Sequence, residues 1–230
     1  MSAEEREQIR VGVLGARGRM GTEVCRAVDA APDMELVAMV DQGDWLSNVT
    51  DAGAEVVVDF TTPDTVMDNL HWCVEQGIHA VVGTSGFTQA RFDRVESWLS
   101  HKPDLGVVIA PNFAVGAVLM IRLAAEAARY LPRTEIVELH HETKVDAPSG
   151  TAKATAEALG GAPIHSVRLP GLVAHQEVLL SQPGELLTIR HDAFSREAYV
   201  AGVLLALEQL SSLPPGLTLG LESLLAGSQG

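Results

Sequence analysis

A short apolar run that leads directly into a glycine-rich loop most restricts the fold of this chain. Ile9–Leu14 has the character of a strand, the loop Gly15–Gly21 has the spacing G-x-x-G-x-x-G, and a helix is predicted from about Met20 to Ala31. Glycines let the backbone approach a pyrophosphate, whose charge then lies at the amino end of the helix. This order of elements is the first unit of a dinucleotide-binding fold, with a variant of its commoner glycine spacing.

An acid stands where such a fold places the residue that binds the adenosine ribose. Leu36–Val40 is predicted as a second strand, and Asp41 follows it about 20 residues after the glycine loop. An alternative interpretation is that Asp41 only starts a turn with Gly43, but the loop upstream favours ribose binding. Arg17 and Arg19 lie inside the loop and are either solvated surface or contacts to a phosphate or ribose.

Strands and helices then alternate at a pace typical of a parallel sheet with helices on both faces. The chain is therefore expected to be an α/β protein with a Rossmann-like, doubly wound parallel sheet. Ligands of such sheets bind beyond the carboxyl ends of the strands. Four segments at those ends could line one crevice, and they begin at Gly15, Asp41, Gly83 and Ala110. The further elements predicted here are the strands Glu55–Phe60, His79–Val82 and Leu105–Ile109, a helix from Pro63 to Gly77 with Thr62 as its N-cap, and a helix Thr88–Ser100.

The pattern changes after Phe113, where a second domain is expected. Its mixture of helices and strand-like runs predicts an α+β domain built on a mixed or antiparallel sheet. The elements are a helix Val115–Leu131, a strand Glu135–Leu139, a helix Ala152–Leu159, and strand-like runs Val167–Leu180 and Leu186–Arg190 separated by a turn at Gln182–Gly184. A last helix, about Arg196–Leu210, precedes Pro214–Gly216 and an apolar tail.

Charge and composition argue against several classes of partner. With 16 Lys and Arg against 30 Asp and Glu the net charge is −14, which disfavours nucleic acid and anionic membranes. Cys25 and Cys73 are the only cysteines and form no C-x-x-C motif, so buried free thiols in a reducing compartment are expected. The polar, acidic Met1–Gln8 is not a signal peptide, and no apolar run reaches about 18 residues, so a cytoplasmic location without a membrane partner is expected.

The stretch His140–Ala152 gathers the side chains best suited to chemistry. It holds two imidazoles, an ammonium, two carboxylates and a Ser-Gly-Thr turn. Pro148 disfavours helical backbone in the residue before it, so a helix is expected to begin near Ser149, with Ser149 or Thr151 as its cap. Free N–H groups at that helix start, together with Lys144, suit an anion such as a carboxylate. A histidine within reach can exchange a proton near neutral pH.

Plainer interpretations of this stretch remain open. A pair of histidines is often only a polar strand end, and Ser-Gly-Thr is often ordinary helix capping. Zinc bound by His140, His141 and Glu142 is a third interpretation. Neighbouring residues on a strand point to opposite faces, however, and no second ligand pair has a suitable spacing. No metal is therefore expected.

Glu138–His141 and Lys144–Ala152 resemble the signature of the 4-hydroxy-tetrahydrodipicolinate reductase (dihydrodipicolinate reductase) family. The resemblance covers almost the whole chain. The glycine loop, Asp41, residues 83–86, residues 110–113 and this signature occur in the family's order.

The resemblance implies two domains and one reaction. Residues 1–113, completed by about 200–230, would bind the dinucleotide, and residues 114–199 would bind substrate and form a homotetramer. The reaction would reduce 4-hydroxy-tetrahydrodipicolinate to tetrahydrodipicolinate with loss of water, using NADH and/or NADPH, in lysine and diaminopimelate biosynthesis. Two rival hypotheses are a nicotinamide-dependent reductase of another small dicarboxylate and a non-catalytic, redox-sensing dinucleotide binder.

The resemblance also assigns roles to individual residues. His140 matches the catalytic histidine, Lys144 the second proton donor and His141 a substrate contact. Gly150 and Thr151 would hold a substrate carboxylate. The residues that would contact the cofactor are Gly15, Ala16, Arg17, Gly18, Arg19, Met20, Asp41, Gly83, Thr84, Ser85, Ala110, Pro111, Asn112 and Phe113.

Two features of the sequence bear on this match. On a regular strand His140 and His141 face opposite ways, so both can face a substrate only if the strand bulges or ends there. Only residues 152–166 separate Thr151 from Val167, fewer than is usual in the family, so a surface loop is expected to be shortened. None of the assigned site residues is lost.

Overall fold

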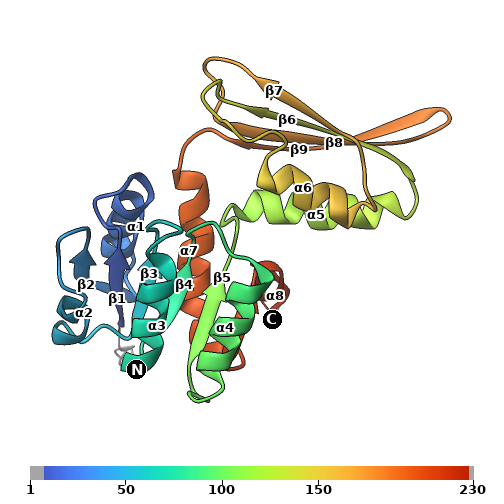
Figure 1. Cartoon of the computed structure of the whole chain (residues 1–230). Helices are drawn as coiled ribbons and strands as arrows, with labels where there is room; N and C mark the ends of the chain where they lie inside the picture. Colours follow the sequence, from blue (N-terminus) through green and yellow to red (C-terminus); the bar gives the residue numbers. More distant parts are fainter. Residues whose placement is uncertain (1–7, 228–230) are drawn as a thin grey trace, which may run out of the picture. The chain divides into compact units, whose positions relative to one another are not determined.

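The structure is a computed structural model that describes residues 8–227. These residues form two compact units (Figure 1). One consists of the described parts of Met1–Phe113 and Val200–Gly230, and the other of Ala114–Tyr199. Each unit has its own sheet and is described by itself.

Six parallel strands form the sheet of the first unit. Their order is β10 (Gly216–Leu219), β5 (Gly106–Ile109), β4 (His79–Val82), β3 (Val56–Asp59), β1 (Ile9–Leu14) and β2 (Met34–Val40). Strands β3, β4 and β5 are buried along nearly their whole length, which explains their continuous valine-rich sequence. The predicted Rossmann-like α/β fold is confirmed.

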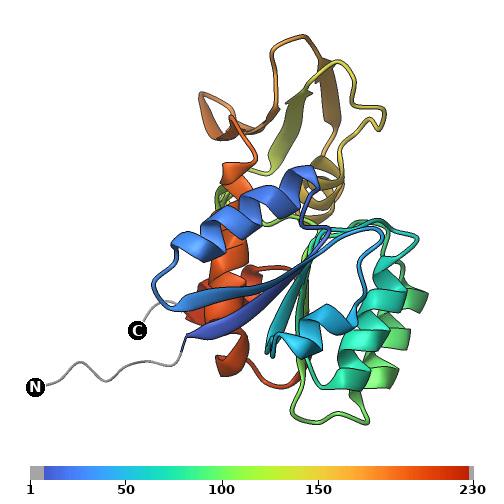
Figure 2. The same cartoon turned by 90° about the vertical axis from the view of Figure 1, so that its left-hand side faces the viewer.

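Helices cover both faces of this sheet, which makes it doubly wound. They are α1 (Arg19–Ala30), α2 (Ser47–Asp51), α3 (Val66–Gln76), α4 (Gln89–Leu99), α7 (Glu197–Gln209), the short η1 (Leu210–Ser212) and α8 (Glu222–Gly227). Helices α3 and α4 share one hydrophobic cluster with β4 and β5, and Figure 2 shows α1 on the opposite face of the sheet. Cys25 on α1 and Cys73 on α3 are buried free thiols, as predicted.

One predicted helix start in this unit is wrong, and one strand was not predicted. The helix expected from Pro63 begins instead at Val66, with Thr65 as its N-cap, because Thr65 N donates to the Thr62 carbonyl at 3.1 Å in a preceding turn. The apolar tail contains the short strand β10, which pairs with β5, a strand far back in the sequence. The predicted end of α3 at Gly77 is confirmed by its left-handed φ of +75°.

Four strands form the mixed sheet of the second unit. Their order is β7 (Ile164–Arg168), β6 (Arg133–His140), β8 (Ala174–Gln182) and β9 (Glu185–Ala193). Strands β6 and β7 are parallel, and the other neighbours are antiparallel. Helices α5 (Val115–Ala128) and α6 (Gly150–Ala158) lie on one face of this sheet (Figure 1), where Ile136, Val178 and Leu180 are fully buried. The predicted α+β unit on a mixed sheet is confirmed.

The single strand-like run predicted from Val167 to Leu180 is wrong. Residues 169–173 form a turn between β7 and β8, because Pro170 cannot donate to a ladder and Gly171 takes a left-handed φ of +81°. The connection from α6 to β7 is short and spans only residues 159–163.

Candidate active site

The glycine loop between β1 and α1 depends on close backbone packing. Gly15 has a φ of +76°, and a Cβ there would lie 2.7 Å from the Phe60 carbonyl oxygen. A Cβ on Gly21 would lie 2.0 Å from the Gly15 carbonyl oxygen. Gly18 is the N-cap of α1 and provides no side-chain capping bond. The amino end of the helix therefore keeps N–H groups for an anion, and the loop fits a dinucleotide pyrophosphate.

Asp41 lies beside this loop, and backbone N–H groups fix its carboxylate. Gln42 N donates to Oδ1 at 2.7 Å and Arg17 N donates to Oδ2 at 2.6 Å. These bonds lower the pKa of Asp41, so the group is ionised at neutral pH. The Arg17 guanidinium pairs with Asp44 instead, at 2.5 Å. Each Asp41 oxygen keeps a further lone pair and can accept a hydrogen bond from a sugar hydroxyl.

A buried acid, Asp59, joins the loops that follow β3 and β4. It is 2% exposed and accepts hydrogen bonds from Thr61 N at 2.8 Å and Oγ1 at 2.7 Å. Thr84 Oγ1 and Asn69 Nδ2 also donate to its carboxylate, each at 2.9 Å. Thr84 is thus turned inward, whereas Ser85 is exposed. Sequence reasoning missed Asp59, although a lone acid at the end of an all-valine strand is a readable signal.

Other predicted cofactor residues also follow the carboxyl ends of strands in the first unit. A Cβ on Gly83 would lie 2.1 Å from the Phe60 ring, which lies 5.9 Å from the Phe113 ring between centroids. Ala110 and Phe113 are buried, whereas Pro111 is exposed. A ligand at this edge would therefore meet backbone atoms more than side chains at residues 110–113.

In the second unit a buried carboxylate holds His140. Glu138 and His140 are two residues apart on β6, so both lie on the face that α5 and α6 cover. The Glu138 side chain is 0% exposed, and His140 Nδ1 lies 2.5 Å from its Oε2. Arg168 on β7 donates to both Glu138 oxygens, at 2.9 and 2.8 Å. Register places Arg168 opposite His140 on the two parallel strands.

The charges of this network follow from its contacts. Burial alone would raise the pKa of Glu138, but hydrogen bonds from Arg168, Ser166 and His140 outweigh it and lower that pKa. Burial lowers the pKa of His140, and Glu138 offsets this effect only in part. The pair is therefore a carboxylate and a neutral imidazole at neutral pH. Because a carboxylate only accepts hydrogen bonds, Nδ1 of His140 carries the proton and Nε2 carries the lone pair.

Two further predicted residues lie in the loop that follows β6. The strand ends at His140, so His141 lies outside the regular alternation, and its Nδ1 is 2.7 Å from Thr143 Oγ1. The Lys144 ammonium donates to both carboxylate oxygens of Asp146, at 2.7 and 2.9 Å. This ion pair also lowers the pKa of Asp146.

Helix α6 begins directly after the Pro148 turn, as predicted. Ser149 is its N-cap, and Ala152 N donates to Ser149 Oγ at 3.2 Å. Gly150, the first helical residue, is exposed, and a Cβ there would meet no atom within 4 Å. Thr151 follows and is half-buried. This helix start therefore has an open side on which a carboxylate could approach the first N–H groups.

The candidate residues fall into two sets. The predicted cofactor residues all lie in the first unit, and the predicted catalytic and substrate residues all lie in the second. Sequence reasoning assigned no role to Glu138 or Arg168. The signal for Glu138 is its position two residues from His140, which places both side chains on one face of a strand.

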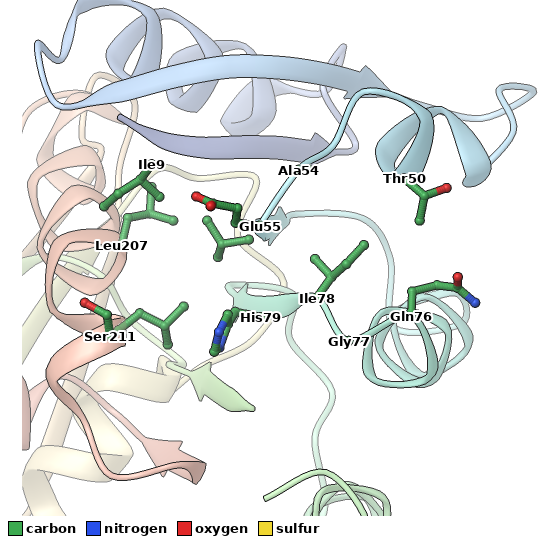
Figure 3. Close-up of a pocket in the computed structure, with 12 residues that line it drawn as sticks. Ile9, Thr50, Ala54, Glu55, Gln76, Gly77, Ile78, His79, Leu207 and Ser211 are labelled. Atoms are coloured by element: carbon green, nitrogen blue, oxygen red, sulfur yellow. The ribbon is translucent and has the colours of Figure 1, made fainter. Parts of the chain in front are cut away.

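A cavity of about 630 Å³ lies elsewhere in the first unit (Figure 3). It opens where β1, β3 and β4 begin, at the edge of the sheet opposite the glycine loop, and Ile9, Glu55, His79 and Leu207 help to line it. It contains none of the predicted site residues. Within residues 8–227, no group of three or more His, Cys, Asp or Glu side chains could hold a metal ion. No helix in that range is long and apolar enough to cross a membrane.

The fold and the glycine loop define a dinucleotide-binding protein of the doubly wound class. Residues 9–113 match the N-terminal and residues 116–225 the C-terminal part of dihydrodipicolinate reductase. The chain belongs to the dihydrodipicolinate reductase family, as predicted.

Named relatives and solved structures agree with this membership. The chain is 52% identical to the 4-hydroxy-tetrahydrodipicolinate reductase of Nocardia farcinica, covering 94% of this chain and 98% of that protein. It is 51% identical to that of Mycolicibacterium smegmatis, covering 94% and 99%. A dipicolinate-bound dihydrodipicolinate reductase from Paenisporosarcina sp. TG-14 superposes with a TM-score of 0.84 at 36% identity, covering 94% of this chain and 99% of that one. The NAD complex of GenD2, at 13% identity and a TM-score of 0.65, shares the fold.

Proposed function

We propose that this protein reduces 4-hydroxy-tetrahydrodipicolinate to tetrahydrodipicolinate with loss of water, using NADH or NADPH. Membership of the dihydrodipicolinate reductase family carries the proposal. The chemistry of the site agrees with it, because the Glu138 carboxylate joins His140 Nδ1 to Ser149 N, the cap of a helix start suited to a carboxylate. We place the reaction in lysine and diaminopimelate biosynthesis.

The first unit would hold the cofactor. The uncapped start of α1 would receive the pyrophosphate, and Asp41 would accept hydrogen bonds from the adenosine ribose. The nicotinamide supplies the hydride when the cofactor is bound. This unit would orient the cofactor, and hydrogen bonds to Asp59 hold the loops after β3 and β4 in place.

The second unit would hold the substrate. N–H groups at Gly150 and Thr151 would bind one carboxylate at the start of α6, and His141 would contact the substrate from the end of β6. Lys144, or His140 when it is protonated at Nε2, would donate the proton that accompanies the hydride, and a positioned acid of this kind contributes roughly 10²–10⁴ in rate. We further propose that this unit forms a homotetramer and that the protein acts in the cytoplasm.

A coupled assay tests the proposed reaction. The substrate is generated enzymatically, and oxidation of NADH and of NADPH is followed with dipicolinate as competitor. We expect substrate-dependent oxidation that dipicolinate inhibits. Oxidation only with a different small dicarboxylate would identify another reductase. Cofactor binding without turnover on any dicarboxylate would identify a dinucleotide sensor.

A further inference from the structure

We propose that Glu138 and Arg168 are positioning residues that align the two proton-carrying side chains, His140 and Lys144. In this view one buried ion pair fixes the tautomer of His140 and anchors the loop that bears Lys144. The inference rests on the proposed function, because it concerns how the same site orients the side chains that transfer its proton.

Glu138 is fully engaged by groups of the candidate site. Its Oε2 receives His140 Nδ1 and Arg168 Nη1, and its Oε1 receives Arg168 Nη2. Ser149 N, at the cap of α6, also donates to Oε1, at 3.3 Å. The same carboxylate thus contacts the histidine and the turn proposed to hold the substrate carboxylate. A shift of Glu138 would disturb both.

Arg168 connects the Glu138 carboxylate to the loop that bears Lys144. Its Nη2 donates to the backbone carbonyl of Asp146 at 2.7 Å, while the Asp146 side chain pairs with Lys144. The guanidinium is planar and rigid, so it can hold a carboxylate on one side and a loop carbonyl on the other in a fixed relation. A lysine at position 168 would keep the charge but lose this geometry.

A contribution to stability alone does not explain this arrangement. Burying an ion pair costs desolvation, and a well-packed apolar pair of the same volume is often as stable. The arrangement fixes a proton position, however. With Nδ1–H directed at Glu138, the lone pair of neutral His140 lies on Nε2, and any proton that His140 transfers must pass through Nε2.

A second glutamate–histidine pair, which joins the same two strands as the Glu138–Arg168 ion pair, provides a matched control. Glu135 on β6 and His165 on β7 pair at 2.6 Å, with side chains that are 56% and 57% exposed. The substitution Glu135→Gln removes the same carboxylate from the same strand but leaves the Glu138 network intact. Its effect on the kinetics should be negligible.

The first test is made on the wild-type protein by nitrogen NMR of labelled histidine, with His140→Gln used only to assign the resonance. We expect His140 in the Nδ1–H tautomer throughout its neutral range. An Nε2–H tautomer, or an even mixture of the two, would overturn the proposal without any variant having to fold. This readout is independent of activity, so a wild-type protein inactive in the coupled assay would contradict only the proposed function.

The second test compares Glu138→Gln, Arg168→Lys and Glu135→Gln. For the first two we expect kcat to fall roughly 10–100-fold, the scale seen when outer partners of a functional histidine are lost, with NADH affinity unchanged. Glu138 raises the pKa of His140, whereas Lys144 and Arg168 lower it. In Glu138→Gln the pKa of His140 should therefore fall, and any limb of the kcat profile that depends on it should move to lower pH. An unchanged tautomer and an unchanged pH profile in Glu138→Gln would overturn the proposal.

Discussion

Asp41 and Glu138 are acids near the carboxyl end of a β-strand, but the two units surround them differently. Asp41 is held by backbone N–H groups of its own loops and remains partly exposed. Glu138 is 0% exposed and is held by a guanidinium, an imidazole and a helix cap. The first arrangement leaves lone pairs for a ligand, whereas the second commits the carboxylate to the protein. Acids of the same charge can thus serve recognition in one unit and alignment in the other.

The largest expected effects come from removing the groups that the second unit aligns. His140→Gln and Lys144→Ala should each lower kcat by roughly 10²–10⁴, the usual contribution of a positioned acid or base. Cofactor affinity should persist, because both residues lie outside the unit that carries the glycine loop. Steady-state kinetics and NADH titration measure the two quantities, with the exposed Lys153→Ala as control. Near wild-type turnover in either variant would remove that residue from the mechanism.

A stability measurement sharpens the contrast between the two acids. Glu138→Leu leaves the Arg168 guanidinium without its carboxylate and should cost about 3–5 kcal/mol of unfolding free energy. Asp41→Asn should cost less, about 1 kcal/mol, because its amide oxygen keeps one of the two loop N–H bonds and a single hydrogen bond is worth about 0.5–1.5 kcal/mol. Hydrogen exchange of peptides from β6, β7 and β2 assigns each effect to its unit.

A compensating variant extends that measurement. Glu138→Leu combined with Arg168→Met should regain much of the lost stability, because replacing a whole buried pair with apolar residues is often neutral. Its kcat should stay low, since His140 lacks its partner. Stability and activity that recover together would contradict the separation between alignment and packing.

The substrate-carboxylate site is expected to respond more weakly. Thr151→Val keeps the shape of the side chain and removes its hydroxyl, so dipicolinate should bind more weakly by about 1.5–3 kcal/mol, the worth of a hydrogen bond to a charged group. Calorimetry compares the variant with Thr188→Val, an exposed threonine on β9. Equal affinities in both variants would place the carboxylate elsewhere.

Most of the fold was predictable because the signals for its strands, turns and helices lie within short segments of the sequence. The strand Ile9–Leu14, its glycine loop and the buried valine run before Asp59 carry their own periodicity and turn residues. Strand β10 has no such signal, since it is short and pairs with β5, which lies far back in the chain. Element boundaries failed for the same kind of reason at Thr62, where a turn precedes the helix.

The candidate residues, and the place of Glu138 two residues from His140, could be predicted from single segments, whereas the contacts of Arg168 could not. His140, Lys144 and the start of α6 stand within one stretch, and the chemistry of each residue type is visible in the sequence. The position of Arg168 opposite His140 follows only from the parallel pairing of β6 and β7. Such pairing depends on tertiary contacts that no local pattern encodes.

Cofactor choice should show the smallest effect, and it tests whether Asp41 meets the ribose. The Asp41 carboxylate would repel the 2′-phosphate of NADPH, and Arg17 is engaged with Asp44 and would attract that phosphate only after breaking this pair. Each of these interactions between exposed charges is worth on the order of 1 kcal/mol, so the repulsion by Asp41 and the attraction by Arg17 should largely cancel. We expect the wild-type ratio of kcat/KM for NADH and NADPH to lie within about tenfold of unity, which corresponds to about 1.4 kcal/mol.

Asp41→Asn keeps an oxygen that can accept one loop N–H bond and should shift the ratio toward NADPH. Glu35→Gln removes an equal charge from an exposed position on β2 and should not shift it. A strong wild-type preference for NADPH, or equal ratios in the two variants, would show that Asp41 does not contact the ribose.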